Sequence, residues 1–180
     1  MTIFELNYIV ALGTVALQVG AILLLGVYFF RKNPFLSPVA DFTGKWGLTV
    51  GFLLALTSTV MSLMYSEYYG VIPCGLCWLQ RAFIYSQVVV FAVALFLKDL
   101  RAAWYSIWLS VCGGIVSLYQ HFIQVGGHEL VPCPASGAGD CAKRFIYEFD
   151  YITFPLVAFS VFAFLIVLML FVRERERSLK

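Results

Sequence analysis

Five long apolar stretches constrain this 180-residue chain more than any other feature of its sequence. Each is about 20 residues long, which is the length that a helix needs to cross the hydrocarbon core of a bilayer. The stretches are continuously apolar and do not alternate with polar residues, so helices are favoured over a β-barrel. We therefore predict an all-α membrane protein with five spans, at Tyr8–Phe30, Trp46–Tyr65, Trp78–Leu97, Trp104–Val125 and Ile152–Val172.

The composition agrees with a lipid bilayer as the main solvent of the chain. Hydrophobic residues make up 62% and charged residues 12% of the sequence, whereas a soluble domain has about 25% charged residues. A small water-soluble protein with so little charge would expose too much apolar surface. The basic residues are few and lie beside the apolar stretches, so nothing indicates a nucleic-acid partner.

The distribution of lysine and arginine predicts the orientation of the chain. With five spans the connecting segments alternate between two sides, and the 12 basic residues divide nine to three. The positive-inside rule places the larger set in the cytoplasm, so the N-terminus is expected outside and the C-terminus inside. The larger set is Arg31, Lys32, Lys45, Lys98, Arg101, Arg173, Arg175, Arg177 and Lys180, and the smaller set is Arg81, Lys143 and Arg144.

The first apolar stretch does not resemble a cleaved signal peptide. A signal peptide has a basic start and a short apolar core. Here Glu5 is the only charged residue before the stretch, the stretch is long, and Arg31 and Lys32 follow it. We expect it to be a retained membrane anchor.

The cysteines indicate redox chemistry outside the cytoplasm. The predicted topology places four of them on the extracytoplasmic side, where disulfides persist, and one inside the fourth span. This count suggests two pairs and one spare thiol. The alternative of a four-cysteine zinc site lacks a second CxxC, so no metal is predicted. The five residues are Cys74, Cys77, Cys112, Cys133 and Cys141.

Cys74 and Cys77 form a CxxC motif at the start of the third span. The partial positive charge of a helix N-terminus stabilises a thiolate, and Arg81 follows Cys77 by one helical turn. This surrounding favours a reactive sulfur. Two plainer interpretations stay open: the motif could be a structural disulfide, and Arg81 could extend its charge to the lipid headgroups.

Cys133 and Cys141 lie in a segment rich in glycine and proline, between the fourth and fifth spans. Such a segment is expected to be a mobile loop. Closing so short a loop stabilises a fold by only about 2.5 kcal/mol. An exposed disulfide there would be open to thiol attack, although a structural bridge is the alternative.

Three other features of the fourth span have modest interpretations. Cys112 is expected to be a small buried side chain in a packed helix. Gly113 and Gly114 would let a neighbouring helix approach closely. His121, near the outer end of the span, is by its pattern alone an interfacial residue.

These residues together resemble the disulfide bond formation protein B (DsbB) family, whose Gram-positive relatives are called BdbC. The segment Cys74–Arg81 resembles the family's C-x-x-C-x-x-x-R signature. The run Leu118–His121 resembles the family's histidine near a quinone, and Gly139–Arg144 with Pro155 resembles the end of its catalytic loop. The resemblance covers roughly Trp46–Val172.

The resemblance implies a thiol:quinone oxidoreductase of the bacterial inner membrane. Its partners would be a DsbA-like thioredoxin-fold protein, the lipid bilayer and a membrane quinone, either ubiquinone or menaquinone. The thioredoxin-fold partner would attack Cys133, which is paired with Cys141, and Cys77, paired with Cys74, would face the quinone. The implied catalytic residues are Cys74, Cys77, Cys133 and Cys141, and the implied quinone-binding residues are Cys77, Arg81 and His121.

The chain departs from the family at its start, because the family usually has four spans and a cytoplasmic N-terminus. We expect an extra transmembrane helix and cytoplasmic loop over residues 1–45, a DsbB-like four-helix domain over 46–172 and a charged cytoplasmic tail over 173–180. The loop cysteines are also closer together than in the best-known members. Vitamin K epoxide reductases share that short spacing, but their loop pair precedes the CxxC.

Two other functions fit parts of the pattern. A transmembrane conduit for reducing equivalents needs thiols that are reachable from both sides, and no cysteine is predicted near the cytoplasmic face. A non-enzymatic membrane protein with structural disulfides could show the same charge pattern. Oxidation of a dithiol protein in the presence of quinone distinguishes these functions from the oxidoreductase.

Overall fold

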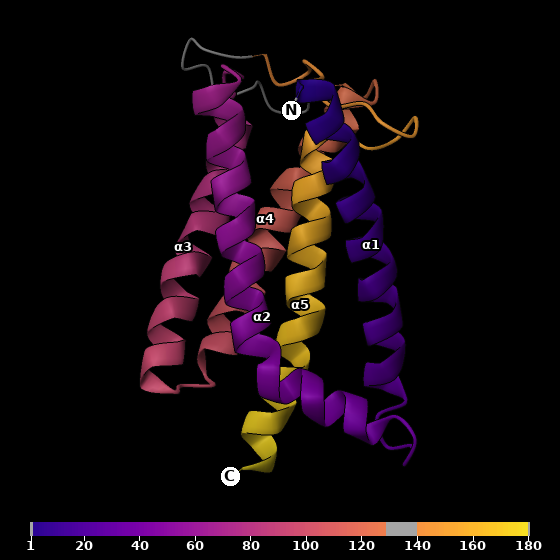
Figure 1. The fold of residues 1–180 in the computed structure, drawn as a ribbon, viewed down its shortest axis with the longest axis vertical. Coiled ribbons are helices and arrows are strands. Elements are labelled where there is room, and N and C mark those ends of the chain that lie inside the picture. Colours follow the sequence, from indigo (N-terminus) through magenta and orange to yellow (C-terminus); the bar gives the residue numbers. More distant parts are fainter. Residues whose placement is uncertain (1, 129–139, 180) are drawn as a thin grey trace.

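The protein is a bundle of long helices that run side by side (Figure 1). The computed structural model describes residues 2–128 and 140–179. This part of the chain contains five helices that are long and apolar enough to span a membrane, which confirms the predicted fold class. They are α1 (Ile3–Phe29), α2 (Ser37–Leu63), α3 (Gly75–Leu97), α4 (Ala102–Gln124) and α5 (Phe154–Ser178), and a short π-helix, η1 (Met64–Tyr68), extends α2.

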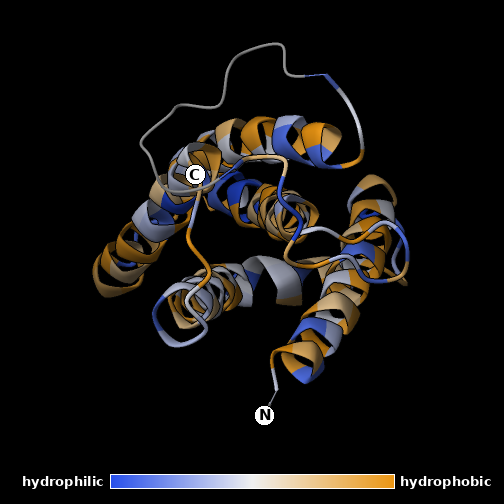
Figure 2. Cartoon of the chain, turned by 90° about the horizontal axis from the view of Figure 1, so that it is seen from above, coloured by the Kyte–Doolittle hydropathy of each residue, from blue (hydrophilic) through white to orange (hydrophobic). Residues whose placement is uncertain are grey.

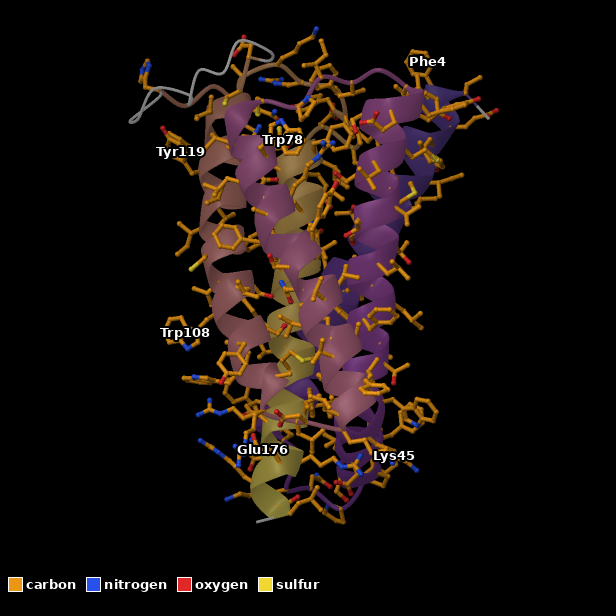
Figure 3. The ribbon with its side chains drawn as sticks, turned by 90° about the vertical axis from the view of Figure 1, so that its left-hand side faces the viewer. Phe4, Lys45, Trp78, Trp108, Tyr119 and Glu176 are labelled. Atoms are coloured by element: carbon orange, nitrogen blue, oxygen red, sulfur yellow. The ribbon has the colours of Figure 1, made fainter. Side chains whose placement is uncertain are left out.

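Helix α5 is the centre of the bundle and contacts α1, α2 and α4. Its side chains Phe162, Leu165 and Met169 are almost fully buried. Large apolar side chains also point outward, as Trp108 does in Figure 3. Figure 2 accordingly shows hydrophobic residues around the outside of the bundle as well as within it. An apolar exterior is what a bundle surrounded by lipid requires.

The two ends of the bundle carry different parts of the chain. The N-terminus, the start of α3 and the segment that follows α4 lie at one end, here called the upper end, and the C-terminus lies at the lower end (Figure 1). Lys45 and Glu176 mark the lower end in Figure 3. The Arg31 Nη2 atom lies 3.1 Å from Glu174 Oε1, and this ion pair ties the end of α1 to α5.

Glycines allow the closest helix crossings. A Cβ atom added to Gly47 of α2 would lie 2.4 Å from Val172 of α5, and one added to Gly113 of α4 would lie 2.4 Å from the Phe162 ring. Small residues at such crossings let helices approach within van der Waals contact. The expected role of Gly113 in close packing is therefore confirmed.

The helices α1 and α2 begin before their predicted spans. A capping box formed by Thr2 and Glu5 starts α1. Helix α2 begins at Ser37, with a proline in its first turn, and its first turns lie across the lower end of the bundle in Figure 1. Hydropathy predicts only the part of a helix that lies in hydrocarbon, so the polar first turns of α1 and α2 lie outside the predicted spans.

The prediction that Cys112 is buried is wrong. Cys112 is an exposed free thiol on α4. The reason is helical geometry, because Gly113 is the residue that faces Phe162 of α5 and adjacent residues in a helix point about 100° apart. Cys112 therefore faces away from this contact.

Candidate functional site

The CxxC motif lies where α3 begins, at the upper end of the bundle. Cys74 is the N-cap residue, and its Sγ atom accepts a hydrogen bond of 3.3 Å from the Cys77 backbone N–H. The two sulfur atoms are 2.7 Å apart, and both residues are free thiols. The hydrogen bond with Cys77, followed by burial, raises the pKa of the Cys74 thiol well above its usual range. The pair is therefore asymmetric, and Cys74 is the more strongly protonated partner.

Gln120 of α4 holds both sulfur atoms. Its Nε2 atom donates hydrogen bonds of 3.1 Å to Cys74 Sγ and 3.3 Å to Cys77 Sγ. Its Oε1 atom accepts a hydrogen bond of 2.7 Å from Gln80 Nε2, which fixes the orientation of the amide. Gln120 is almost fully buried. A buried amide N–H directed at sulfur favours the charged form of a thiol.

Sequence reasoning did not assign a role to Gln120. The sequence does indicate that Gln120 has a polar partner, because a glutamine inside an apolar span is costly without one. The sequence could not identify that partner, since Gln120 and Cys77 lie on different helices and 43 positions apart.

Arg81 lies one turn below Cys77 and is bound to α2. Its Nε atom donates to Ser62 Oγ at 2.9 Å, and an Nη2 hydrogen bond of 3.0 Å reaches the Ser62 carbonyl. Its guanidinium also lies 5.1 Å from the centre of the Trp78 ring. Within the described residues, Arg81 makes no ion pair with a carboxylate. The guanidinium is therefore held in place while its positive charge stays uncompensated beside the motif.

A cavity of about 430 Å³ opens beside these residues. Cys74, Cys77 and Arg81 belong to its lining, so the motif and the arginine share one space. The charged and amide lining residues are near the upper end, the hydroxyl groups of Thr14, Thr57 and Ser58 lie below them, and the deepest lining is apolar. The deeper apolar residues are Leu17, Leu54, Ile84, Val161 and Phe162.

Cys141 packs against the CxxC motif. It is fully buried in a cluster that also contains Cys74, Leu76 and Ile123, and it is disulfide-bonded. The expectation of an exposed, mobile disulfide is therefore wrong for the Cys141 side chain. The other predicted member of this pair, Cys133, lies outside the described residues.

The segment around Cys141 is held in place by α4. Gln124 Nε2 donates to the carbonyls of Cys141 and Lys143 at 3.3 and 3.0 Å. In return, Arg144 Nε donates to the Gln124 carbonyl. These contacts place Cys141 next to the motif although a long stretch of chain separates them.

His121 does not line the cavity. Its Nδ1 atom is 2.8 Å from the hydroxyl of Thr153, the residue before α5. Thr153 is fully buried, so this contact joins α4 to the start of α5. The predicted role of His121 near a quinone stays a prediction.

The fold and the site define a membrane thiol–disulfide protein, and comparisons with known proteins agree. The model of the family described as "Disulfide bond formation protein DsbB" matches residues 44–172, and the chain belongs to this family. The chain is 34% identical over 133 residues to "Probable disulfide formation protein C" of Halalkalibacterium halodurans, covering 73% of this chain and 93% of that relative.

Two further relatives also carry names of disulfide formation proteins. The "SPbeta prophage-derived disulfide bond formation protein B" of Bacillus subtilis is 34% identical over 129 residues, covering 72% of this chain and 86% of the relative. A "Probable disulfide formation protein" of Metapseudomonas resinovorans is 32% identical over 133 residues, covering 73% and 90%. No solved structure matches the chain.

Proposed function

We propose that this protein is a thiol:quinone oxidoreductase that reoxidises a DsbA-like thioredoxin-fold dithiol protein outside the cytoplasm and passes the electrons to a membrane quinone. The observation that carries the proposal is the shared lining of Cys77, Arg81 and Gln120 at the polar end of a cavity whose other lining residues are mostly apolar. A reactive cysteine pair is thereby exposed to a space that suits a membrane-soluble acceptor. Membership of the DsbB family supports disulfide formation as the outcome.

Location and orientation belong to the same proposal. The upper end, which carries the CxxC motif and Cys141, would face the outside of a bacterial inner membrane. The basic residues near Lys45, Arg101 and Arg173 would then face the cytoplasm, as the positive-inside rule requires. Both cysteine pairs would be extracytoplasmic, with the N-terminus outside and the C-terminus inside.

The first transfer is a pair of thiol–disulfide exchanges. A thiolate of the partner attacks the Cys133–Cys141 disulfide at Cys133, which forms a mixed disulfide and releases Cys141 as a thiolate. The second thiol of the partner then displaces Cys133, so the partner leaves oxidised and the loop pair is a dithiol. Burial of Cys141 supports Cys133 as the attacked sulfur.

The second transfer moves the disulfide from the motif to the loop pair. The loop dithiol attacks the Cys74–Cys77 disulfide, which becomes two thiols while Cys133 and Cys141 are bonded again. Packing of Cys141 against Cys74 supports this exchange, because it needs little movement. The Cys74–Cys77 dithiol then holds the two electrons and two protons that came from the partner.

The residues around the cavity fit a quinone. Arg81 supplies a fixed cation for a carbonyl oxygen, and Gln120 supplies an amide close to both sulfurs. Gln124 also lines the cavity, and its buried Oε1 atom has no partner among the described residues, so it can accept from a hydroxyl group. A bound quinone would accept two electrons and two protons, which restores the Cys74–Cys77 disulfide.

The deciding experiment mixes purified protein, a reduced thioredoxin-fold oxidase and a quinone, and follows quinone reduction by absorbance. We expect turnover that requires all four cysteines, whereas Cys112→Ala should retain nearly all of it. Turnover without the loop pair, or none with any quinone in a folded protein, would contradict the proposal.

A further inference from the structure

We infer that α1 forms one wall of a subsite for the apolar isoprenoid tail of the quinone, an inference that rests on the proposed function. Helix α1 lies before the residues that match the family model, which begin at 44. It nevertheless contributes to the same cavity as the CxxC motif. The contributing residues are Val10, Gly13, Thr14 and Leu17.

Helix α1 is held against the rest of the bundle by specific polar contacts. Near its start, Asn7 Nδ2 donates to the Phe145 carbonyl at 3.3 Å and Asn7 Oδ1 accepts from the Tyr65 hydroxyl at 2.8 Å. Farther along, Gln18 Nε2 donates to Ser160 Oγ at 3.0 Å. These contacts lie on either side of the lining residues along the helix, so the lining part of α1 is fixed in position.

The lining residues suggest that the ring and the tail of a quinone would lie at different depths in the cavity. The ring needs polar partners and access to sulfur, and both are found at Cys77 and Arg81. The tail is a hydrocarbon, and the deepest lining residues of α1 and α2 are the apolar side chains Leu17 and Leu54, below the hydroxyl groups of Thr14, Thr57 and Ser58. Burial of each CH₂ group there is favourable relative to water and fixes the direction of the molecule.

Gly13 marks the place where the cavity reaches the outer surface of the bundle. It belongs to the cavity lining and is also exposed. A Cβ atom added there would meet no atom within 4 Å. A larger side chain at Gly13 can therefore occupy part of the cavity without displacing protein atoms. Such a variant tests whether α1 is a wall of the tail subsite.

The test compares Gly13→Leu with Gly26→Leu. Gly26 lies on the same helix and also has no atom within 4 Å of an added Cβ, but it does not line the cavity. Equilibrium binding is measured by quenching of tryptophan fluorescence with a tailless quinone and with the same ring bearing an isoprenoid tail. Turnover with each quinone and thermal unfolding are measured on the same preparations.

We expect Gly13→Leu to weaken binding of the tailed quinone about tenfold, which corresponds to roughly two CH₂ groups left unburied. Binding of the tailless quinone should stay within about twofold of the parent, and Gly26→Leu should match the parent with both. A second variant, Leu17→Ala, removes apolar contact instead of adding bulk and should weaken tailed-quinone binding about threefold.

The outcomes separate this inference from the proposed function. If the parent binds and reduces both quinones but Gly13→Leu and Leu17→Ala behave like Gly26→Leu, α1 is not a wall of the tail subsite. Equal weakening of tailed and tailless quinones would also overturn the inference, because the effect would then lie at the ring. If the parent neither binds nor reduces a quinone, the proposed function itself fails.

Discussion

At the scale of single residues, the chemistry depends on the different burial and hydrogen bonding of two sulfur atoms. Cys74 is buried as the N-cap of α3, and its pKa is raised by its hydrogen bond with Cys77 and by burial. Gln120 then donates to both sulfurs from α4. Cys77 lies one helical turn from Arg81 and lines the same cavity, so we propose that it is the sulfur that reacts with the quinone.

The hydrogen bonds of Gln120 predict a loss of activity without a loss of fold. Gln120→Leu removes the amide donor from both sulfurs and should slow quinone reduction about tenfold, since a hydrogen bond to a charged group contributes roughly 1.5–3 kcal/mol. Alkylation of the reduced motif near neutral pH should slow in parallel, which is measured by mass spectrometry.

Gln87→Leu is the matched control for that prediction. Gln87 is also a buried glutamine inside a span, but it bonds Ser106 and Ser110 and not the cysteines. It should alter thermal stability and leave alkylation of the motif unchanged. Equal alkylation rates in Gln120→Leu and the parent would show that Gln120 only packs.

Arg81 predicts a graded series of variants. Its two contacts with Ser62 use the fork of the guanidinium, which lysine cannot reproduce even though it keeps the charge. Arg81→Lys should retain part of the turnover, and Arg81→Met should raise the apparent KM for quinone at least about tenfold. Ser62→Ala keeps the cation and should have a smaller effect than Arg81→Met. Parental kinetics in Arg81→Met would mean that Arg81 serves only the lipid interface.

At the scale of elements, the positions of the helices depend on a few small residues. Gly113 brings α4 against Phe162 of α5, and Phe162 also lines the cavity. Gln120 lies two turns farther along α4. The crossing at Gly113 therefore fixes how far the amide of Gln120 is from the motif on α3.

We expect the same substitution to have opposite results at Gly113 and at Gly114. A Cβ atom at Gly113 would lie 2.4 Å from Phe162, whereas one at Gly114 would be no closer than 3.7 Å to any neighbouring side chain. Gly113→Ala should therefore destabilise the fold by about 1–3 kcal/mol, while Gly114→Ala should be tolerated. Thermal unfolding in detergent measures both, and equal melting temperatures would contradict the close crossing.

At the scale of the whole molecule, the bundle brings distant parts of the chain to one end. The CxxC motif, Cys141 and the mouth of the cavity all lie near the upper end, and the basic tail of α5 lies at the lower end (Figure 1). In the proposed function, a soluble partner would approach this end from water and a quinone would approach the CxxC motif from the bilayer.

This arrangement predicts where the partner is trapped. When the partner carries a single attacking cysteine, Cys141→Ala should accumulate a mixed disulfide through Cys133, because the thiol that would resolve it is missing. Cys133→Ala should trap little, since Cys141 is fully buried. A non-reducing gel of each variant measures the complex. Trapping mainly on Cys74 or Cys77 would show that the loop disulfide is structural.

The five membrane helices and the position of the CxxC motif at a helix start could be predicted from the sequence alone. Both follow from local properties, because hydrocarbon thickness sets the length of an apolar run and a helix N-terminus is defined within one turn. The same local information led to the expectation that Cys112 is buried, which was wrong because its exposure depends on which face of α4 meets α5.

The residues that surround the sulfur atoms could not be predicted from the sequence, because they come together only in the folded bundle. The hydrogen bonds from Gln120, the packing of Cys141 against Cys74 and the contribution of α1 to the cavity join residues that are far apart in the chain. Such contacts depend on the angles and rotations at which helices pack, which small residues such as Gly47 and Gly113 set. The hydropathy of a segment does not depend on how the helix is rotated about its axis. It therefore predicts the spans but not the site between them.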